Sequence, residues 1–196
     1  MPQHYGHKDL RIVSQSSPTG TQFLQAVGCA MSRKWENNHE IVYVSSGEGS
    51  TSEGEFHEAL NWASREKLPI IFHIQDNEYA ISTHRSEQTA GSVFSLVSGY
   101  ENLSKYQVDG TDFFETHLAF KQAVERARRG KGPSVIISNV VRLMPHSSSD
   151  DQRKYRTEKS LEDDLKRDPI VQFKQICLDK KIFTEANAKK LEDRIK

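Results

Sequence analysis

Two polar stretches of the sequence contain the side chains whose types and spacing could do chemistry. Residues 47–50 (Gly-Glu-Gly-Ser) directly follow one apolar run, and residues 76–79 (Asp-Asn-Glu-Tyr) directly follow another. A carboxylate from Glu48, an amide oxygen from Asn77 and the main-chain carbonyl of Tyr79 are hard oxygen ligands. Such ligands suit Mg²⁺ or Ca²⁺ and leave coordination positions for phosphate oxygens and water. The two stretches therefore predict a metal site that holds a phosphate group.

The turn around Gly49 has two features that favour an anion. A glycine lets a phosphate approach the backbone, and a helix that begins near Ser52 would offer free N–H groups. Taken alone, a Gly-x-Gly turn after a strand is a weak signal, and an Asp-Asn pair is also an ordinary turn. The turn is not a P-loop, since no Gly-Lys-Ser/Thr follows, and it lacks the three-glycine dinucleotide fingerprint. The pairing of the two turns, one after each strand of a single unit, favours the metal-phosphate interpretation.

The elements that must position these turns form a βαβ unit. The continuous apolar runs at residues 40–45 and 69–74 are typical of strands buried on both faces, and residues 52–67 between them have helical periodicity. The strands should be parallel with a right-handed crossover. Ligands bind beyond the carboxyl ends of parallel strands. If the two strands are neighbours, Glu48 and Asn77 lie within a few ångströms of one another.

The rest of the chain extends this pattern and predicts an α/β fold, a parallel twisted sheet flanked by helices. Residues 142–157 have no apolar periodicity, and helical patterns follow them. We expect an α/β domain over residues 1–157 and a helical C-terminal extension over 158–196. The other predicted elements are helices at 21–33, 112–129, 161–167, 169–179 and 184–196, strands at 106–108 and 134–141, a polar loop at 76–88 and a helical turn at 93–96.

Several helix positions are expected to face inward because they recur at helical spacing. Gly28 is expected to permit close packing, since glycine inside a helix otherwise costs about 1 kcal/mol. The expected inward-facing residues are Phe23, Val27, Ala30, Met31, Phe56, Leu60, Trp62, Ala63, Phe114, Leu118, Val124 and Ala127.

Composition narrows the classes of function. The 196 residues suffice for one domain with a sizeable core. Lys and Arg number 27, as do Asp and Glu, so charge gives no reason to expect nucleic acid or an anionic membrane as partner. Only Cys29 and Cys177 occur, and no apolar run is long enough to span a bilayer or to form a signal peptide. We expect a cytoplasmic protein with reduced thiols.

The Gly-Glu-Gly triplet at Gly47, followed one βαβ unit later by Asp-Asn, resembles the signature of thiamine diphosphate enzymes, and hence their diphosphate-binding domain. The sequence around these residues and elsewhere in the chain resembles the alpha subunit of 2-oxoacid dehydrogenase complexes. Glu48 in place of the commoner Asp, and the loop His-Ser-x-Ser-Asp-Asp from His146, resemble the branched-chain type more than the pyruvate type. The resemblance runs from Met1 to about Pro169. Its segments are residues 16–18 with 21–22, 47–54, 68–72, 79–83, 108–110, 146–151 and 155–156.

The resemblance implies a thiamine diphosphate site with Mg²⁺ held by Glu48, the Asn77 side chain and the Tyr79 carbonyl. His146 would lie near the diphosphate and the reacting carbon and help proton transfer, and Ser147 resembles a serine that kinases phosphorylate in animal relatives. The implied cofactor-binding residues are Gly47, Glu48, Gly49, Ser50, Asn77, Ala80, Ile81, Ser17 and His146. A candidate potassium site, for which a plain helix cap is the alternative, comprises Ser16, Pro18, Thr21 and Gln22.

The resemblance also implies the activity and the partners. The whole enzyme would oxidatively decarboxylate a branched-chain 2-oxoacid and transfer the acyl group to a lipoyl-bearing acyltransferase. A beta subunit or fused beta domain would carry the pyrimidine half of the site, in a dimer of alpha–beta units, so the isolated chain would be inactive. The alternatives are a pyruvate or acetoin dehydrogenase alpha part, or a non-catalytic assembly module of the same fold. A transketolase is less favoured, because the loop at His146 does not suit it.

Three positions depart from the family pattern. Asp76 stands where the first Asn is usual, which would add negative charge near the phosphates. Gln75 stands where branched-chain relatives have a basic residue. Thr19 stands where those relatives have an apolar residue, which weakens the substrate assignment.

Overall fold

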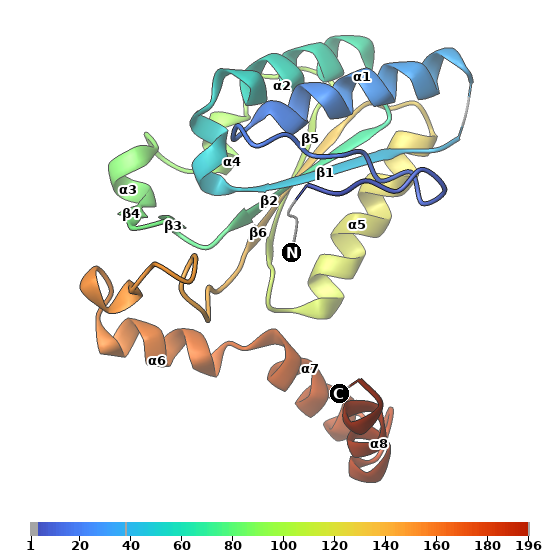
Figure 1. The fold of residues 1–196 in the computed structure, drawn as a ribbon. Helices are drawn as coiled ribbons and strands as arrows, with labels where there is room; N and C mark the ends of the chain where they lie inside the picture. The colour runs from blue at the N-terminus through green and yellow to red at the C-terminus, as the bar shows by residue number, and fades with distance from the viewer. Residues whose placement is uncertain (1–3, 38, 196) are drawn as a thin grey trace.

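A four-stranded parallel sheet forms the centre of the protein in the computed structural model, which describes residues 4–37 and 39–195. Its order is β1-β2-β6-β5, and every neighbouring pair is parallel (Figure 1). The two strands of the predicted βαβ unit are neighbours, which meets the condition for Glu48 and Asn77 to lie close together. Gly47 pairs in register with Gln75, and Asp76 pairs with Asn139, so these strand ends meet at one edge. The strands are β1 (Val42–Gly47), β2 (Ile70–Asp76), β5 (Ser104–Asp109) and β6 (Ser134–Asn139).

Helices cover both faces of the sheet. α1 (Thr21–Trp35) and α2 (Gly54–Glu66) lie on one face and α5 (Phe113–Arg128) lies on the other (Figure 1). The apolar strand residues divide between the two layers: Phe72 and Ile74 pack under α1 and α2, whereas Ile71 and Ile136 pack under α5. This double cover is why the central strands β2 and β6 are continuous apolar runs. The edge strand β1 is not buried on both faces as predicted, since Tyr43 is 53% exposed. The predicted fold class is confirmed.

Two boundaries near the polar turns differ from the prediction. A 3-10 helix, η1 (Glu48–Ser52), lies between β1 and α2, so the α-helix begins at Gly54 rather than at Ser52. The predicted polar loop at 76–88 is instead folded into short elements beyond the carboxyl end of β2 (Figure 1). These are β3 (Tyr79–Ala80), β4 (Thr83–His84) and α3 (Arg85–Gln88), with α4 (Val93–Leu96) following.

The buried face of α5 differs from the prediction at Phe114 and Leu118, whereas Ala127 is buried as predicted. Phe114 is 44% exposed and Leu118 is 54% exposed, whereas Ala119, Ala123 and Ala127 are buried. These alanines recur every fourth residue and face the sheet, where their small size allows close packing. Trp62 of α2 is likewise exposed, and Gly28 of α1 faces open space, so close packing does not explain it.

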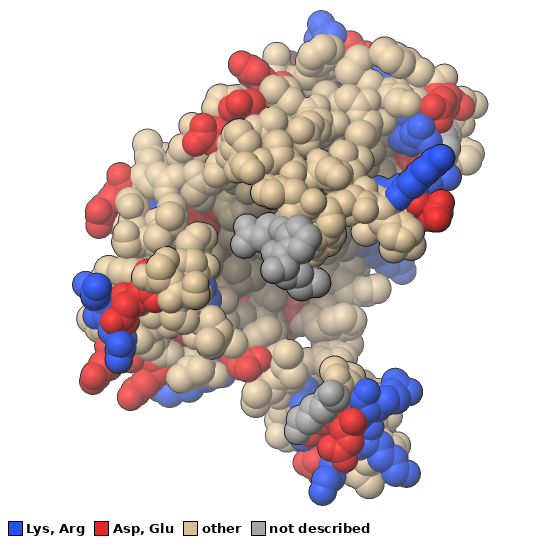
Figure 2. All heavy atoms as spheres, in the orientation of Figure 1, with Lys and Arg blue, Asp and Glu red and all other residues tan. Residues whose placement is uncertain are grey.

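The C-terminal helices form an extension beside the sheet, as predicted (Figure 1). The Phe113 and Phe173 ring centroids lie 4.7 Å apart, and Arg167 pairs with Asp109 at 3.2 Å, so side chains join the extension to the end of β5. Figure 2 shows acidic and basic side chains interspersed over this extension. Its elements are α6 (Glu158–Lys166), α7 (Pro169–Asp179) and α8 (Glu185–Ile195), and η2 (Gln152–Lys154) precedes them. No helix within the described ranges could cross a membrane.

Candidate functional site

Glu48 and Asn77 meet at the carboxyl edge of the sheet, as expected for neighbouring parallel strands. The backbone N–H of Asn77 donates a hydrogen bond to Oε2 of Glu48 at 3.2 Å. Glu48 is the first residue after β1, and its side chain is only 1% exposed. Its other oxygen, Oε1, is buried and has no hydrogen-bond partner among the described residues. A buried carboxylate with a free oxygen is the donor that a hard metal cation needs.

The electrostatic setting of Glu48 disfavours its charge in the protein alone. Burial raises the pKa of the Glu48 carboxyl, hydrogen bonds from backbone N–H groups lower it, and the charges of Asp76 and Arg85 act in opposite directions. Desolvation is the largest cause, because an ionised carboxyl loses its hydration on burial. A bound cation would offset that cost and keep the carboxylate ionised.

The segment after β2 is held as a tight turn by its own side chains. Oδ1 of Asn77 accepts from the backbone N–H of Tyr79 at 3.1 Å, and Oδ1 of Asp76 accepts from that of Glu78 at 3.0 Å. Glu78 has a φ of 70° and Ile81 a φ of 56°, both left-handed. An amide oxygen has a second lone pair, so Asn77 can serve the turn and still coordinate a cation. Two of the predicted metal ligands, Asn77 and Tyr79, therefore lie in this turn, and the Asn77 backbone joins it to Glu48.

The two glycines of the triplet have different surroundings. A Cβ at Gly49 would lie 2.7 Å from Cβ of Ala80, so this glycine allows β3 to approach closely. A Cβ at Gly47 would meet no atom nearer than the Gln75 carbonyl oxygen at 3.9 Å. The Ser50 hydroxyl is turned inward and donates to the Gly47 carbonyl at 2.7 Å. The predicted diphosphate residues thus form one compact turn, with its open side at Gly47.

The candidate potassium segment reaches this turn through one residue. Nε2 of Gln22 donates to Oγ of Ser46 at 3.2 Å, and that hydroxyl also pairs with Ser50. Oγ of Ser16 is buried with no partner in the described part of the chain. Ser17 is exposed and hydrogen-bonds to His4, so none of its printed bonds joins it to the triplet. Pro18 and Thr21 lie on the same segment, at the start of α1.

A series of hydrogen bonds links the His146 backbone to the antiparallel hairpin formed by β3 and β4. Its backbone N–H donates to Oδ2 of Asp150 at 2.9 Å, and that oxygen also accepts from the hydroxyl of Tyr155 at 2.6 Å. Arg142 donates to the Tyr155 hydroxyl at 2.7 Å and to the Ile81 carbonyl at 2.8 Å. The imidazole itself is exposed, and no hydrogen bond between described residues joins it to the metal turn. The loop is therefore tied to the site through Asp150, Tyr155 and Arg142 rather than through the imidazole.

Two residues of α3 contact the turns and were not anticipated. Arg85 forms an ion pair with Asp76, so the extra negative charge expected from Asp76 is compensated. Nε2 of Gln88 donates to the Gly49 carbonyl at 2.6 Å. The only signal in the sequence was that a carboxylate ending a buried strand needs a cation, but nothing local indicated which one.

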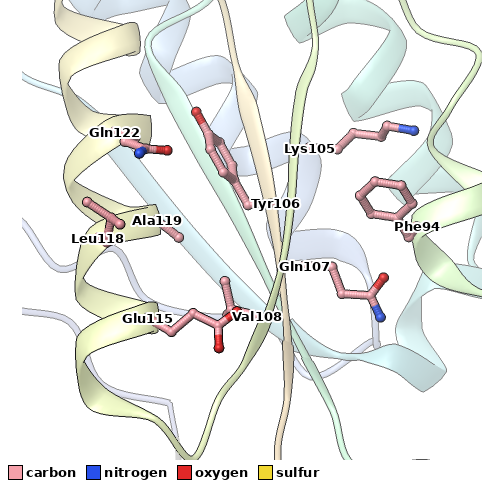
Figure 3. Close-up of a pocket in the computed structure, with 9 residues that line it drawn as sticks. All are labelled: Phe94, Lys105, Tyr106, Gln107, Val108, Glu115, Leu118, Ala119 and Gln122. Atoms are coloured by element: carbon pink, nitrogen blue, oxygen red, sulfur yellow. The ribbon is translucent and has the colours of Figure 1, made fainter.

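Other features do not compete with this site. Within the described ranges no group of three or more His, Cys, Asp or Glu side chains could hold a metal, and the predicted donor set contains only one of these residue types. A hollow of about 400 Å³ lies along β5. Figure 3 shows Leu118 and Gln122 of α5 on one side of β5 and Phe94 on the other. The hollow contains none of the predicted site residues.

Comparison with known proteins gives a consistent family. A family model described as "Dehydrogenase E1 component" matches residues 1–196, beyond the expected limit near Pro169. The chain is 42% identical over 174 residues to the 2-oxoisovalerate dehydrogenase subunit alpha of Bacillus subtilis, covering 88% of this chain and 52% of that protein. It is 35% identical over 178 residues to the pyruvate dehydrogenase E1 component subunit alpha of Staphylococcus aureus (strain Mu50), covering 90% and 48%. The chain thus spans about half the length of these relatives.

Solved structures share the fold. A transketolase of Campylobacter jejuni matches with a TM-score of 0.58 and 23% identity over 67% of this chain and 21% of that chain. A Mycobacterium smegmatis protein described as a thiamin diphosphate-dependent enzyme matches with a TM-score of 0.51 and 22% identity, covering 67% and 24%. The resemblance to alpha subunits, with a branched-chain member among the relatives, is confirmed.

Proposed function

The chain belongs to the dehydrogenase E1 component family, and we propose that it is the alpha part of a thiamine diphosphate-dependent 2-oxoacid dehydrogenase. Its reaction would be oxidative decarboxylation of a branched-chain 2-oxoacid, with transfer of the acyl group to a lipoyl-bearing acyltransferase. The observation that carries the proposal is the buried Glu48 carboxylate at the carboxyl edge of the sheet: its Oε2 accepts from the backbone N–H of Asn77, and its Oε1 has no partner among the described residues.

The residues fit a metal-bound diphosphate. Glu48, the Asn77 side chain and the Tyr79 carbonyl would hold Mg²⁺, which prefers oxygen ligands and retains positions for phosphate oxygens. The open side of the turn at Gly47 leaves room for the diphosphate. The further residues proposed to contact the cofactor are Ser17, Gly49, Ser50, Ala80, Ile81 and His146.

The roles of the chain are to bind and to orient. Bound thiamine diphosphate would supply the stabilisation of negative charge that decarboxylation requires. His146 would hold or move a proton near the reacting carbon, because its imidazole is exposed and its loop is tied to Ile81 through Arg142. Potassium at Ser16, Pro18, Thr21 and Gln22 would order the start of α1 beside the triplet. The Ser16 hydroxyl, which is buried and has no partner among residues 4–37 and 39–195, supports that assignment.

The proposed partners follow from the proposal that this chain binds only the diphosphate half of the cofactor, which we call the half-site. A beta subunit or fused beta domain would supply the pyrimidine half, and two alpha–beta units would form the dimer. Residues 1–157 would form the cofactor-binding domain and 158–196 a helical extension. The chain alone would therefore be inactive.

Calorimetry tests this function directly. With the beta partner present, we expect thiamine diphosphate and Mg²⁺ to bind, and Glu48→Ala or Asn77→Ala to abolish binding. Turnover of 2-oxoisovalerate should require the beta partner. Clear turnover by the isolated chain would contradict the half-site proposal, and absence of binding with the beta partner would favour a non-catalytic module.

A pyruvate dehydrogenase alpha part is the second candidate, because relatives of that description are 35% identical to the chain. Acetoin dehydrogenase belongs to the same alternative. Comparing kcat/KM for 2-oxoisovalerate, pyruvate and acetoin in the reconstituted enzyme decides among them.

A further inference from the structure

Asp76 is a buried carboxylate inside the turn that would hold the metal. It is 3% exposed, and its Oδ2 pairs with the guanidinium of Arg85. The Arg85 side chain is 26% exposed and also lies 3.4 Å from Oε1 of Glu78. Removing one partner of a buried ion pair leaves an uncompensated charge, which is strongly unfavourable. The ion pair between Arg85 and Asp76 therefore stabilises the turn that follows β2.

Arg85 closes the hairpin by its backbone as well as by its side chain. Its N–H donates to the Glu78 carbonyl at 2.8 Å, while its guanidinium reaches back to Asp76 at the end of β2. Between these contacts lie Asn77 and Tyr79. Asn77 donates to Glu48 and accepts from Tyr79. Loss of the ion pair between Arg85 and Asp76 would thus disturb Asn77, which is joined to Asp76 by a peptide bond.

The charges near the turn require such a cation. Glu48, Asp76 and Glu78 are all acidic, and a diphosphate would add further negative charge. Gln75, the residue before Asp76, is uncharged. Arg85 is the basic side chain that contacts two of these three carboxylates.

We propose that Arg85 is a positioning residue of the metal-diphosphate site: it neutralises Asp76 and fixes the turn from Asn77 to Tyr79. It acts through Asp76 and does not touch the cofactor. The inference rests on the proposed function for its binding readout, but not for its effect on the turn.

The test is a double-mutant cycle in the full-length protein with its beta partner. Arg85→Met should weaken binding of Mg²⁺ and thiamine diphosphate by about 10- to 100-fold, the usual cost of losing a residue that orients a metal ligand. Asp76→Asn combined with Arg85→Met should restore affinity to within about threefold, because the buried charge is gone. Arg129→Met, which removes an exposed ion pair with Glu125, is the matched control and should change nothing.

Amide hydrogen exchange of Asn77 and Tyr79 without cofactor provides a readout that is independent of binding. We expect faster exchange in Arg85→Met and recovery in the double variant. Unchanged exchange in Arg85→Met would overturn the proposal. Binding that stays weak in the double variant would also overturn it, because Arg85 would then act on the cofactor directly. If the wild type binds no cofactor, the proposed function fails, while the exchange measurements still decide the role of Arg85.

Discussion

The backbone N–H of Asn77 donates to Oε2 of Glu48 at 3.2 Å, which joins the residue after β2 to the residue after β1. Only one of the two carboxylate oxygens is used in this contact, and the other has no partner among the described residues. This asymmetry leads to a first prediction that separates ligand binding from folding.

Glu48→Gln should leave the free energy of unfolding of the unliganded chain within about 1 kcal/mol, because removing a costly buried charge offsets the weaker hydrogen bond. The same variant should lose Mg²⁺ affinity by about 100-fold, since an amide is a poorer ligand than a carboxylate. Denaturant titration and calorimetry measure the two quantities. Glu58→Gln, at an exposed position of α2, is the control. Unchanged Mg²⁺ affinity in Glu48→Gln would contradict the assignment of the ligand.

The two glycines of the triplet should respond in opposite ways to substitution. Gly49→Ala would force its Cβ against Ala80 and should destabilise the protein by about 1–3 kcal/mol. Gly47→Ala meets no close atom and should fold normally, yet it should weaken cofactor binding by about tenfold if the diphosphate lies there. Thermal unfolding and calorimetry distinguish the two. Equal effects of both variants on stability would count against this geometry.

His73 should make stability depend on pH. It is buried in β2, hydrogen-bonded to the Tyr43 hydroxyl at 2.8 Å and to Ser138 Oγ at 2.9 Å, and burial lowers the pKa of its imidazole below 6.5. As pH falls through the unfolded pKa, the unfolded chain takes up the proton first. Stability is thus fully present above that pKa and is lost as pH falls toward the folded pKa, by at most about 1.4 kcal/mol per pH unit.

His73→Gln should flatten this dependence, because an amide can hydrogen-bond but does not titrate in this range. Unfolding free energies between about pH 5.5 and about pH 7.5 provide the measurement. His39→Gln, at an exposed site, should keep the wild-type dependence. The same slope in His73→Gln as in the wild type would assign the effect to other groups.

Tyr155→Phe should impair turnover without impairing cofactor binding. The hydroxyl donates to Asp150 and accepts from Arg142, so it ties the loop of His146 to the hairpin. Its loss should lower kcat of the reconstituted enzyme by about tenfold, because proton transfer depends on position. Tyr5→Phe, far out on the surface, is the control. A loss of metal affinity equal to the loss of kcat would show that this series of hydrogen bonds serves the metal turn instead.

Patterns within short stretches of sequence predicted much of this structure. The apolar runs located β2 and β6, because strands covered on both faces have no polar alternation. The helix predicted at residues 169–179 has these bounds in the structure, where Asp168 caps it and proline occupies its first turn. The meeting of Glu48 and Asn77 was expected if the two strands of the βαβ unit are neighbours, and the sheet order meets that condition.

The sequence by itself therefore determined the fold class, the family and the two turns that carry the candidate ligands. Tertiary structure decided the rest, because those features depend on residues brought together by packing. The alanine face of α5 is buried instead of Phe114 and Leu118, because the helix packs close to the sheet. The partner of Asp76 was decided by a hairpin that brings Arg85 back to the end of β2. A buried charge requires a counter-charge, but only the path of the chain in space identifies which residue supplies it.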